Sequence, residues 1–222
     1  MKILLVEDHR LVADAMQVML KQLGPDVNVT ACYSTQHALS LLDEKTHFDL
    51  ILSDLIMPGI DGIGLLVGLN NRAIQVPVVI ITGAEDERAV RSAYENGAAG
   101  FISKSLPSVE LVNGLKQVMS GKSCFPDNVA LDDQTSGAAN RHNTLDTSEG
   151  FSRKPGEKQL QVLRLMADGN SNKQISQIVG ISEATVKYHT SQLFKLFSVK
   201  NRTSCVREAQ SRGLLERYTT AV

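Results

Sequence analysis

The sequence predicts an α/β protein: a doubly wound sheet of five parallel strands, followed by a small all-α domain of four helices. Short apolar runs alternate with helix-period segments over the first half of the chain, whereas helical periodicity alone follows residue 157. The charge divides in the same place. Residues 1–150 carry 11 Lys+Arg and 19 Asp+Glu and residues 151–222 carry 12 and 5, so the net charges are −8 and +7. An acidic part joined to a basic part indicates two tasks, and the basic part suits a polyanion.

Five apolar runs of the first part are predicted strands. Most of them are too continuous to be half exposed, which is typical of strands in a parallel sheet that helices cover on both faces. They span residues 2–6, 27–33, 48–53, 76–82 and 100–104.

Helices are expected in the gaps between these strands. Apolar residues recur at steps of three and four from Val12 to Leu23, and Gly24 follows them. Segments 85–97 and 107–121 each end in Gly after a plausible start signal. The alternation of strand and helix predicts the parallel order of the sheet.

Polar residues stand at the carboxyl ends of four predicted strands. Glu7 and Asp8 follow the first, Asp54 follows the third, Thr82 ends the fourth and Lys104 ends the fifth. In open α/β sheets, ligands bind beyond these ends. One acid at such a place is more often a turn former or helix cap, but five polar residues together indicate a site. Three crowded carboxylates repel each other without a cation, and oxygen ligands suit Mg²⁺.

The second part contains a helix-turn-helix pattern. Helices are predicted over residues 157–169, 171–180, 182–198 and 203–215. Gly180 ends the second of them and Ser182 is placed to cap the third. The expected core of the pattern is Ile175, Ile178, Val179, Val186, Leu193 and Phe197. The expected opposite, basic face carries Lys187, Tyr188, Ser191 and Lys195.

The remaining features set the domain boundaries and the compartment. Residues 132–150 hold almost no large apolar side chain and cannot offset their chain entropy, so we expect a linker. The predicted division is 1–122, a linker over 123–150, and 151–222. Three widely spaced cysteines suggest neither zinc nor disulfides, which fits a reducing cytoplasm. Without a signal peptide or an apolar run near 18 residues, we expect a soluble, cytoplasmic protein with no membrane partner.

The motifs "VEDH", "SDLIMPGIDG", "ITG" and "FISK", in this order and spacing, resemble the receiver domain of bacterial response regulators, a flavodoxin-like sheet. The resemblance implies that Asp54 accepts a phosphoryl group from a phosphohistidine of a sensor histidine kinase. It implies roles for Lys104 on a phosphoryl oxygen, for the Thr82 hydroxyl and for Phe101 as a switching aromatic. It also implies a Mg²⁺ site, whose charge would offset that of the phosphoryl group. The implied ligands are Asp8, Asp54, the backbone carbonyl of Ile56 and, through water, Glu7.

Some residues depart from the family pattern or have a simpler explanation. Ser105 stands where the family usually has Pro, often with a cis peptide. Because a cis bond costs about 3 kcal/mol for a non-proline residue, the sequence leaves the isomer of this peptide open. Phe101 is equally well explained as a core aromatic. Four histidines show no ligand spacing and are expected to be solvated or capping residues: His9, His37, His47 and His142.

Residues 169–206 resemble the LuxR-type four-helix DNA-binding domain, and the resemblance covers nearly all of residues 151–217. It implies that the helix from Glu183 enters the major groove of double-stranded DNA, with Lys187 and Tyr188 toward base edges. The implied phosphate contacts are Asn172, Lys173, Thr185, His189, Lys195 and Arg202. Two alternatives stay open: Tyr188 can pack on a neighbouring helix, and His189 can be purely structural.

Together the two resemblances predict a phosphorylation-dependent transcriptional response regulator of the NarL/FixJ type, not an enzyme. We expect a homodimer when it is phosphorylated or bound to DNA, with Val206 and Ala209 as candidate contacts. One alternative is a phosphatase of the haloacid dehalogenase class, but its second acid would fall at Ile56. The other is a regulator that ignores phosphorylation, although such proteins typically lose acids that this chain retains.

Overall fold

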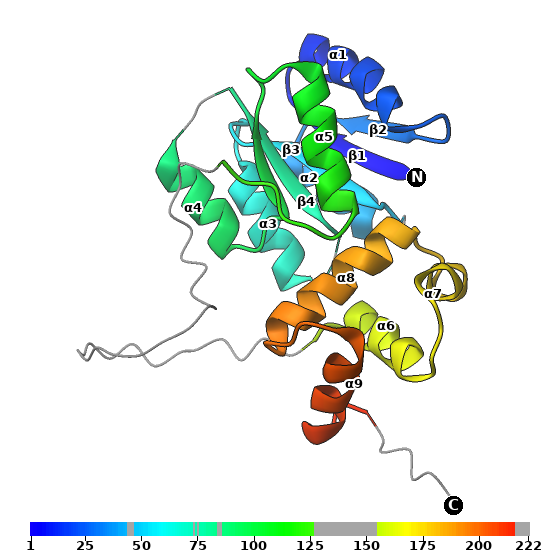
Figure 1. Ribbon diagram of the computed structural model, residues 1–222. Helices are drawn as coiled ribbons and strands as arrows, with labels where there is room; N and C mark the ends of the chain where they lie inside the picture. The colour runs from blue at the N-terminus through cyan, green and yellow to red at the C-terminus, as the bar shows by residue number, and fades with distance from the viewer. Residues whose placement is uncertain (44–46, 73, 75, 84–85, 127–154, 216–222) are drawn as a thin grey trace, which may run out of the picture.

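The computed structural model describes residues 1–43, 47–72, 74, 76–83, 86–126 and 155–215. It confirms the predicted fold class: a five-stranded parallel sheet with helices on both faces precedes a helical domain (Figure 1). The strands are β1 (Lys2–Val6), β2 (Asn28–Cys32), β3 (Leu50–Asp54), β4 (Val78–Thr82) and β5 (Gly100–Ser103). The helices of the first part are α1 (Arg10–Leu20), the 3-10 helix η1 (Lys21–Leu23), α2 (Thr35–Asp43), α3 (Gly62–Asn71), α4 (Glu87–Glu95) and α5 (Ser108–Met119). Those of the second part are α6 (Glu157–Ala167), α7 (Asn172–Val179), α8 (Glu183–Leu196) and α9 (Arg202–Ser211).

The strands lie in the order β2-β1-β3-β4-β5, and each neighbouring pair is parallel. The strand order reverses between β1 and β3, where ligands bind in sheets of this kind. Val6 is the register partner of Ser53, so the residues that follow them, Glu7 and Asp54, reach the carboxyl edge at the same level.

Alternate residues of β1 point to opposite faces of the sheet and belong to two separate cores. Leu4 and Val6 pack with apolar residues of α2, α3 and α4. Ile3 and Leu5 pack with those of α1 and α5. Both faces of the sheet are therefore covered, as the continuous apolar runs predict.

The turn between α7 and α8 forms as predicted. Gly180 ends α7 with φ 75°, in the left-handed region that favours glycine, and the Ser182 Oγ accepts a hydrogen bond from the Thr185 amide at 3.1 Å. These helices pack with α6 and α9 around a third core.

Two predictions about this helical domain are wrong. Ile178 is 56% exposed, because Ile175 and Val179, four residues apart, take the buried face of the short helix α7. Ala209 is fully buried in the core of the helical domain, so its side chain is not available for the expected dimer contact.

The chain remains attached to the sheet beyond α5. The Phe101 amide donates to the Cys124 carbonyl at 2.7 Å, and the Phe125 ring meets Tyr94 edge to face. The rest of the predicted linker lies outside the described residues. Within the described ranges, no helix has both the length and the apolar character needed to cross a membrane.

Candidate functional site

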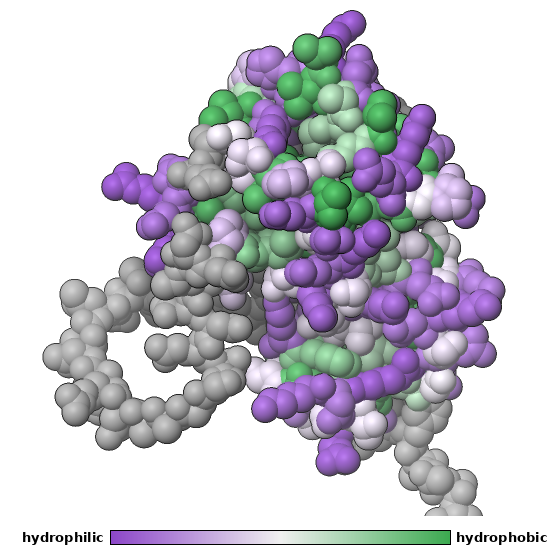
Figure 2. Space-filling view, turned by 45° about the horizontal axis from the view of Figure 1, so that its top comes forward, coloured by the Kyte–Doolittle hydropathy of each residue, from purple (hydrophilic) through white to green (hydrophobic). Residues whose placement is uncertain are grey.

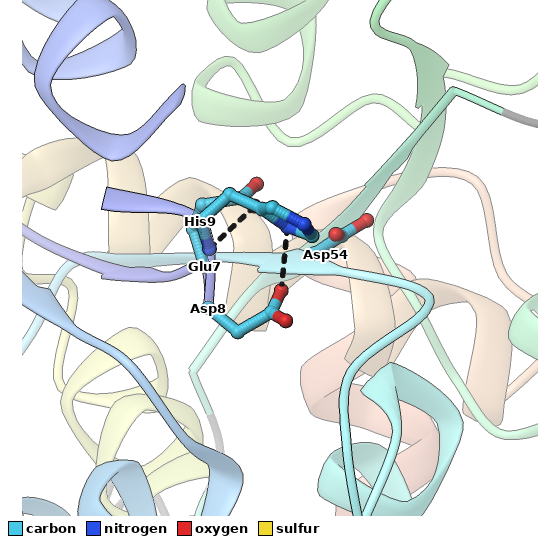
Figure 3. Close-up of side chains that lie close together, drawn as sticks. All are labelled: Glu7, Asp8, His9 and Asp54. Carbon is cyan, nitrogen blue, oxygen red and sulfur yellow. Dashed lines mark hydrogen bonds and ion pairs between the residues drawn. The ribbon is translucent and has the colours of Figure 1, made fainter. Parts of the chain in front are cut away.

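An acidic cluster lies at the carboxyl edge of the sheet (Figure 3). Glu7 and Asp8 come from the turn after β1, and Asp54 comes from the end of the neighbouring strand β3. One ligand atom from each of these acids and one from His9 all lie within 4.8 Å of one another. The sheet thus brings together the three carboxylates that the sequence predicts to share a site.

His9 also belongs to this cluster, which the sequence analysis did not expect. Its side chain is 70% exposed, yet Nδ1 lies 3.1 Å from the Asp8 Oδ1 and 3.4 Å from the Glu7 Oε1 (Figure 3). His9 also stands at the N-cap of α1, but its side chain makes no cap hydrogen bond, so of its two predicted roles the exposure fits the solvated one. The only signal in the sequence is its place directly after two acids.

Lys104 connects the two buried carboxylates of the cluster. Its Nζ donates to the Glu7 Oε2 at 2.6 Å and lies 3.0 Å from the Asp54 Oδ2. Burial by itself would lower the pKa of Lys104, but the hydrogen bonds and charges of Glu7 and Asp54 outweigh it and raise the pKa above its ordinary value. Lys104 is therefore a cation held against Asp54.

The donor set of the cluster fits a hard divalent cation. Glu7 and Asp54 are 1% and 7% exposed, and buried like charges are costly unless cations lie close to them. The three acids present carboxylate oxygens, which are the ligands that Mg²⁺ prefers. The residues present can thus hold a metal ion at this edge.

The other predicted receiver residues lie on the neighbouring strands. Thr82 is buried at the end of β4, and its carbonyl accepts from the Lys104 amide at 2.7 Å. Phe101 is buried in the core between the sheet and α2 to α4, so it has the core role that was one of its two explanations. The Ile56 side chain is exposed, and the Lys104–Ser105 peptide is trans.

The helix predicted to enter DNA lies against the first domain (Figure 1). Tyr188 of α8 is 8% exposed because its ring joins the apolar cluster between the sheet and the helices α1 and α5. A Cβ added to Gly121 would lie 2.8 Å from the Lys187 carbonyl, so the end of α5 closely approaches the backbone of α8. Tyr188 is thus packed, as its alternative explanation allows, but against the first domain.

The predicted phosphate contacts divide into accessible and buried residues. Lys173 and Lys195 are exposed, Asn172 is half-buried, and Lys187, the predicted base contact, is also exposed. Thr185 is buried, and its hydroxyl donates to Asp49 of the first domain.

Two predicted phosphate contacts are engaged inside the helical domain instead. The Arg202 Nη2 donates to the carbonyls of Met166 and Asn170 at 2.8 and 2.6 Å. His189 is 1% exposed and, among the described side chains, its buried Nδ1 has no hydrogen-bond partner. Burial, followed by the nearby charge of Lys158, lowers the pKa of His189 to about 4. For both residues the structure supports a structural role.

Comparison with known protein families matches both parts of the chain. Residues 3–116 match the model described as "Response regulator receiver domain". Residues 156–209 match the model described as "Bacterial regulatory proteins, luxR family". The chain belongs to the LuxR family of response regulators. It joins a receiver domain to a LuxR-type DNA-binding domain, and its relatives are transcriptional response regulators.

Several regulators of this family are similar over nearly their whole length. The glycerol metabolism activator of Pseudomonas putida is 34% identical over 208 residues, which cover 94% of each chain. The nitrate/nitrite response regulator protein NarL of Escherichia coli K12 is 28% identical over 200 residues, which cover 90% of each chain.

Solved structures of the family share the fold. A LuxR family DNA-binding response regulator from Silicibacter pomeroyi is 28% identical with a TM-score of 0.50, covering 57% of this chain and 97% of that chain. The RcsB response regulator of Salmonella typhimurium is 20% identical with a TM-score of 0.54, covering 93% of this chain and 98% of that chain. The RcsB likeness covers both domains and supports the fold alone.

Proposed function

We propose that Asp54 accepts a phosphoryl group from a sensor histidine kinase and that this phosphorylation controls DNA binding by the C-terminal domain. The observation that carries this proposal is the position of Asp54: a buried carboxylate at the switch point of the sheet, beside a lysine and two further acids. Positioning and electrostatic stabilisation are what phosphoryl transfer requires of a protein.

In the proposed reaction, a carboxylate oxygen of Asp54 attacks the phosphorus of a phosphohistidine. The phosphorus–nitrogen bond breaks, its electron pair stays on the imidazole, and an acyl phosphate forms on Asp54. Lys104 is held 3.0 Å from the Asp54 Oδ2, where its charge supports the negative phosphoryl oxygens. Asp8, Asp54, the Ile56 carbonyl and, through water, Glu7 would hold Mg²⁺, which when bound supplies further positive charge for the transferring group.

Phosphorylation has a physical route to the DNA-binding domain. A phosphoryl group adds negative charge beside Lys104, whose backbone is joined to Thr82 and hence to the β4–β5 edge. In the structure two of the predicted DNA contacts on α8, Tyr188 and Thr185, face the receiver domain. Phosphorylation is proposed to favour an arrangement in which α8 is free, and a phosphorylated homodimer to bind double-stranded DNA.

The test is labelling of the purified chain with acetyl phosphate and Mg²⁺, followed by mass measurement of the intact protein. Asp54→Asn should abolish labelling, because an amide cannot form the acyl phosphate. Asp61→Asn is the matched control, since Asp61 lies in the same loop and caps α3 through the Gly64 amide, a bond that Asn can also accept. Labelling of the Asp54 variant at the level of the control would refute the assignment. A wild-type chain that takes up no label would instead favour the alternative of a regulator that ignores phosphorylation.

A further inference from the structure

A carboxylate of the receiver domain binds the first residues of the predicted DNA-recognition helix. The Asp49 Oδ1 accepts a hydrogen bond from the Ser182 amide at 2.9 Å, and the Thr185 hydroxyl lies 3.2 Å from the same oxygen. The Thr185 hydroxyl also lies 3.3 Å from the Asp49 backbone carbonyl. Ser182 is the N-cap of α8, so Asp49 contacts the positive end of that helix.

Asp49 is held in place by the sheet. Its Oδ2 accepts from the Lys2 amide at 2.7 Å, and its own amide donates to the Lys2 carbonyl at 2.8 Å. One carboxylate oxygen thus binds β1 and the other binds α8. Asp49 directly precedes β3, which begins at Leu50, so the sheet fixes the position of its carboxylate.

The groups that bind Asp49 are those that bind a phosphate. Backbone N–H groups at a helix N-terminus and a nearby hydroxyl are a ready anion site, and DNA-binding domains use such groups on the phosphates of the duplex. The resemblance to LuxR-type domains independently implies that Thr185 contacts a DNA phosphate. In the structure, its hydroxyl faces a carboxylate of the same chain.

We propose that Asp49 takes the place of a DNA phosphate at the N-terminus of α8. The carboxylate and the duplex then compete for the Ser182 amide and the Thr185 hydroxyl, so that docking on the receiver and DNA binding exclude each other. This inference deepens the proposed function and rests on it: phosphorylation of Asp54 has to release a helix whose anion site the receiver already fills.

The variant Asp49→Asn tests this role. The Lys2 and Ser182 amides bind different oxygens of Asp49, whereas an amide side chain keeps only one of these two positions as an acceptor and carries no charge. Asp43→Asn is the matched control, because it removes the same charge from the receiver surface at a residue whose ion pair is with Arg72. The DNA probe is a duplex selected from a randomised library by the phosphorylated wild-type chain.

Without phosphorylation, the Asp49 variant should bind this duplex roughly tenfold more tightly than the wild type and the control, the factor expected when a charge-assisted hydrogen bond is lost from the docked state. After phosphorylation all three chains should bind equally. Equal affinities before phosphorylation, or a gain of the same size in both states, would overturn the proposal.

Amide hydrogen exchange provides a second measurement that does not depend on DNA. In the unphosphorylated Asp49 variant, the Ser182 amide should exchange faster than in the wild type and the control, while the amides of β1 and β3 stay protected and so report an intact sheet. Unchanged exchange at Ser182 would overturn the proposed role of Asp49. A chain that binds no duplex even when phosphorylated would instead count against the proposed function, and the exchange at Ser182 would still decide the role of Asp49.

Discussion

A single lysine joins the two most buried carboxylates of the acidic cluster. Lys104 contacts both Glu7 and Asp54, although the three residues come from three different strand ends. A phosphoryl group on Asp54 would add negative charge beside this ion pair. The Lys104 ammonium would then bind the phosphoryl oxygens in competition with Glu7. The consequences of phosphorylation therefore begin with individual side chains at this edge.

Thr82 is predicted to transmit the new charge rather than to accept the phosphoryl group. Thr82→Ala should still be labelled by acetyl phosphate at Asp54, but its affinity for DNA should no longer rise after phosphorylation, because the hydroxyl that would move onto the phosphoryl group is missing. The measurement is DNA affinity before and after labelling. Thr30→Ala, an exposed change on β2, is the control and should keep the gain. A normal gain in the Thr82 variant would contradict the role.

At the scale of elements, the helix α8 uses its two faces for different partners. Val186 and Leu193 belong to the core of the helical domain and His189 is buried, whereas Thr185 and Tyr188 face the receiver. The faces follow from the 3.6-residue period, which places residues three and four apart on the same side. Two predicted DNA contacts, Thr185 and Tyr188, therefore lie on the face that contacts the receiver, whereas a third, His189, lies on the buried face of the helix.

Two lysines of this helix are predicted to contact DNA in different ways. In the phosphorylated chain, Lys187→Ala should relax the preference at one operator position by about 1 to 3 kcal/mol, because the side chain is predicted to reach a base edge. Lys195→Ala should weaken all sequences alike and reduce the slope of log affinity against log salt by about 1. Titrations against a randomised duplex library at several salt concentrations measure both, and each variant serves as the control for the other. The proposed register would be wrong if Lys187→Ala changed the salt slope alone.

His189 should make the helical domain sensitive to acid. Its pKa is lowered to about 4 in the folded chain, mainly by burial, against an ordinary value of 6.5. The unfolded chain therefore binds a proton on His189 more readily than the folded chain does. The stability that neutral His189 contributes is complete above pH 6.5 and is lost as the pH falls toward 4. The loss is about 3 kcal/mol at most.

The check is urea unfolding followed by helical circular dichroism, at neutral pH and at mildly acid pH. His189→Leu should reduce the pH dependence in this window, because it removes the titrating group and its unsatisfied Nδ1. The exposed His37 on α2 is the matched position, and His37→Leu should leave the pH dependence unchanged. Equal pH dependence in both variants would show that His189 does not titrate as the structure implies.

On the scale of the whole molecule, two domains with separate cores contact each other through α8. The sheet domain and the helical domain each enclose their own apolar clusters, and Tyr188 is the buried residue of α8 that enters a receiver cluster. The hydrogen bond that Asp49 accepts from the Ser182 amide and the close approach at Gly121 complete the contact. Because each domain has a core of its own, the contact suits an equilibrium between docked and released arrangements.

Limited proteolysis tests the predicted division of the chain. The composition of residues 132–150 offers almost no large apolar side chain for burial, so the first cuts should fall between about 125 and 150 and release two stable fragments. Mass measurement of early fragments locates the cuts, and the urea-unfolded chain under the same protease shows which bonds are cleavable at all. First cuts within β1 to α5 or within α6 to α9 would contradict the division.

The sequence by itself determined the elements and the acidic edge. Continuous apolar runs predict buried strands, and Gly180 with Ser182 predicts the turn, because backbone conformation and capping depend on residues close together in the chain. The meeting of Asp8 and Asp54 also follows, since the carboxyl ends of parallel strands share one edge.

Only the tertiary structure decided which groups those elements meet. Ser182 and Asp49 are 133 positions apart, and neither carries a local signal for the other. The burial of His189, the carbonyl contacts of Arg202 and the exposure of Ile178 likewise depend on neighbours that pack from other helices. The physical reason is that hydrogen bonding along a helix or strand is local, whereas the choice of partner depends on whole surfaces fitting together in three dimensions.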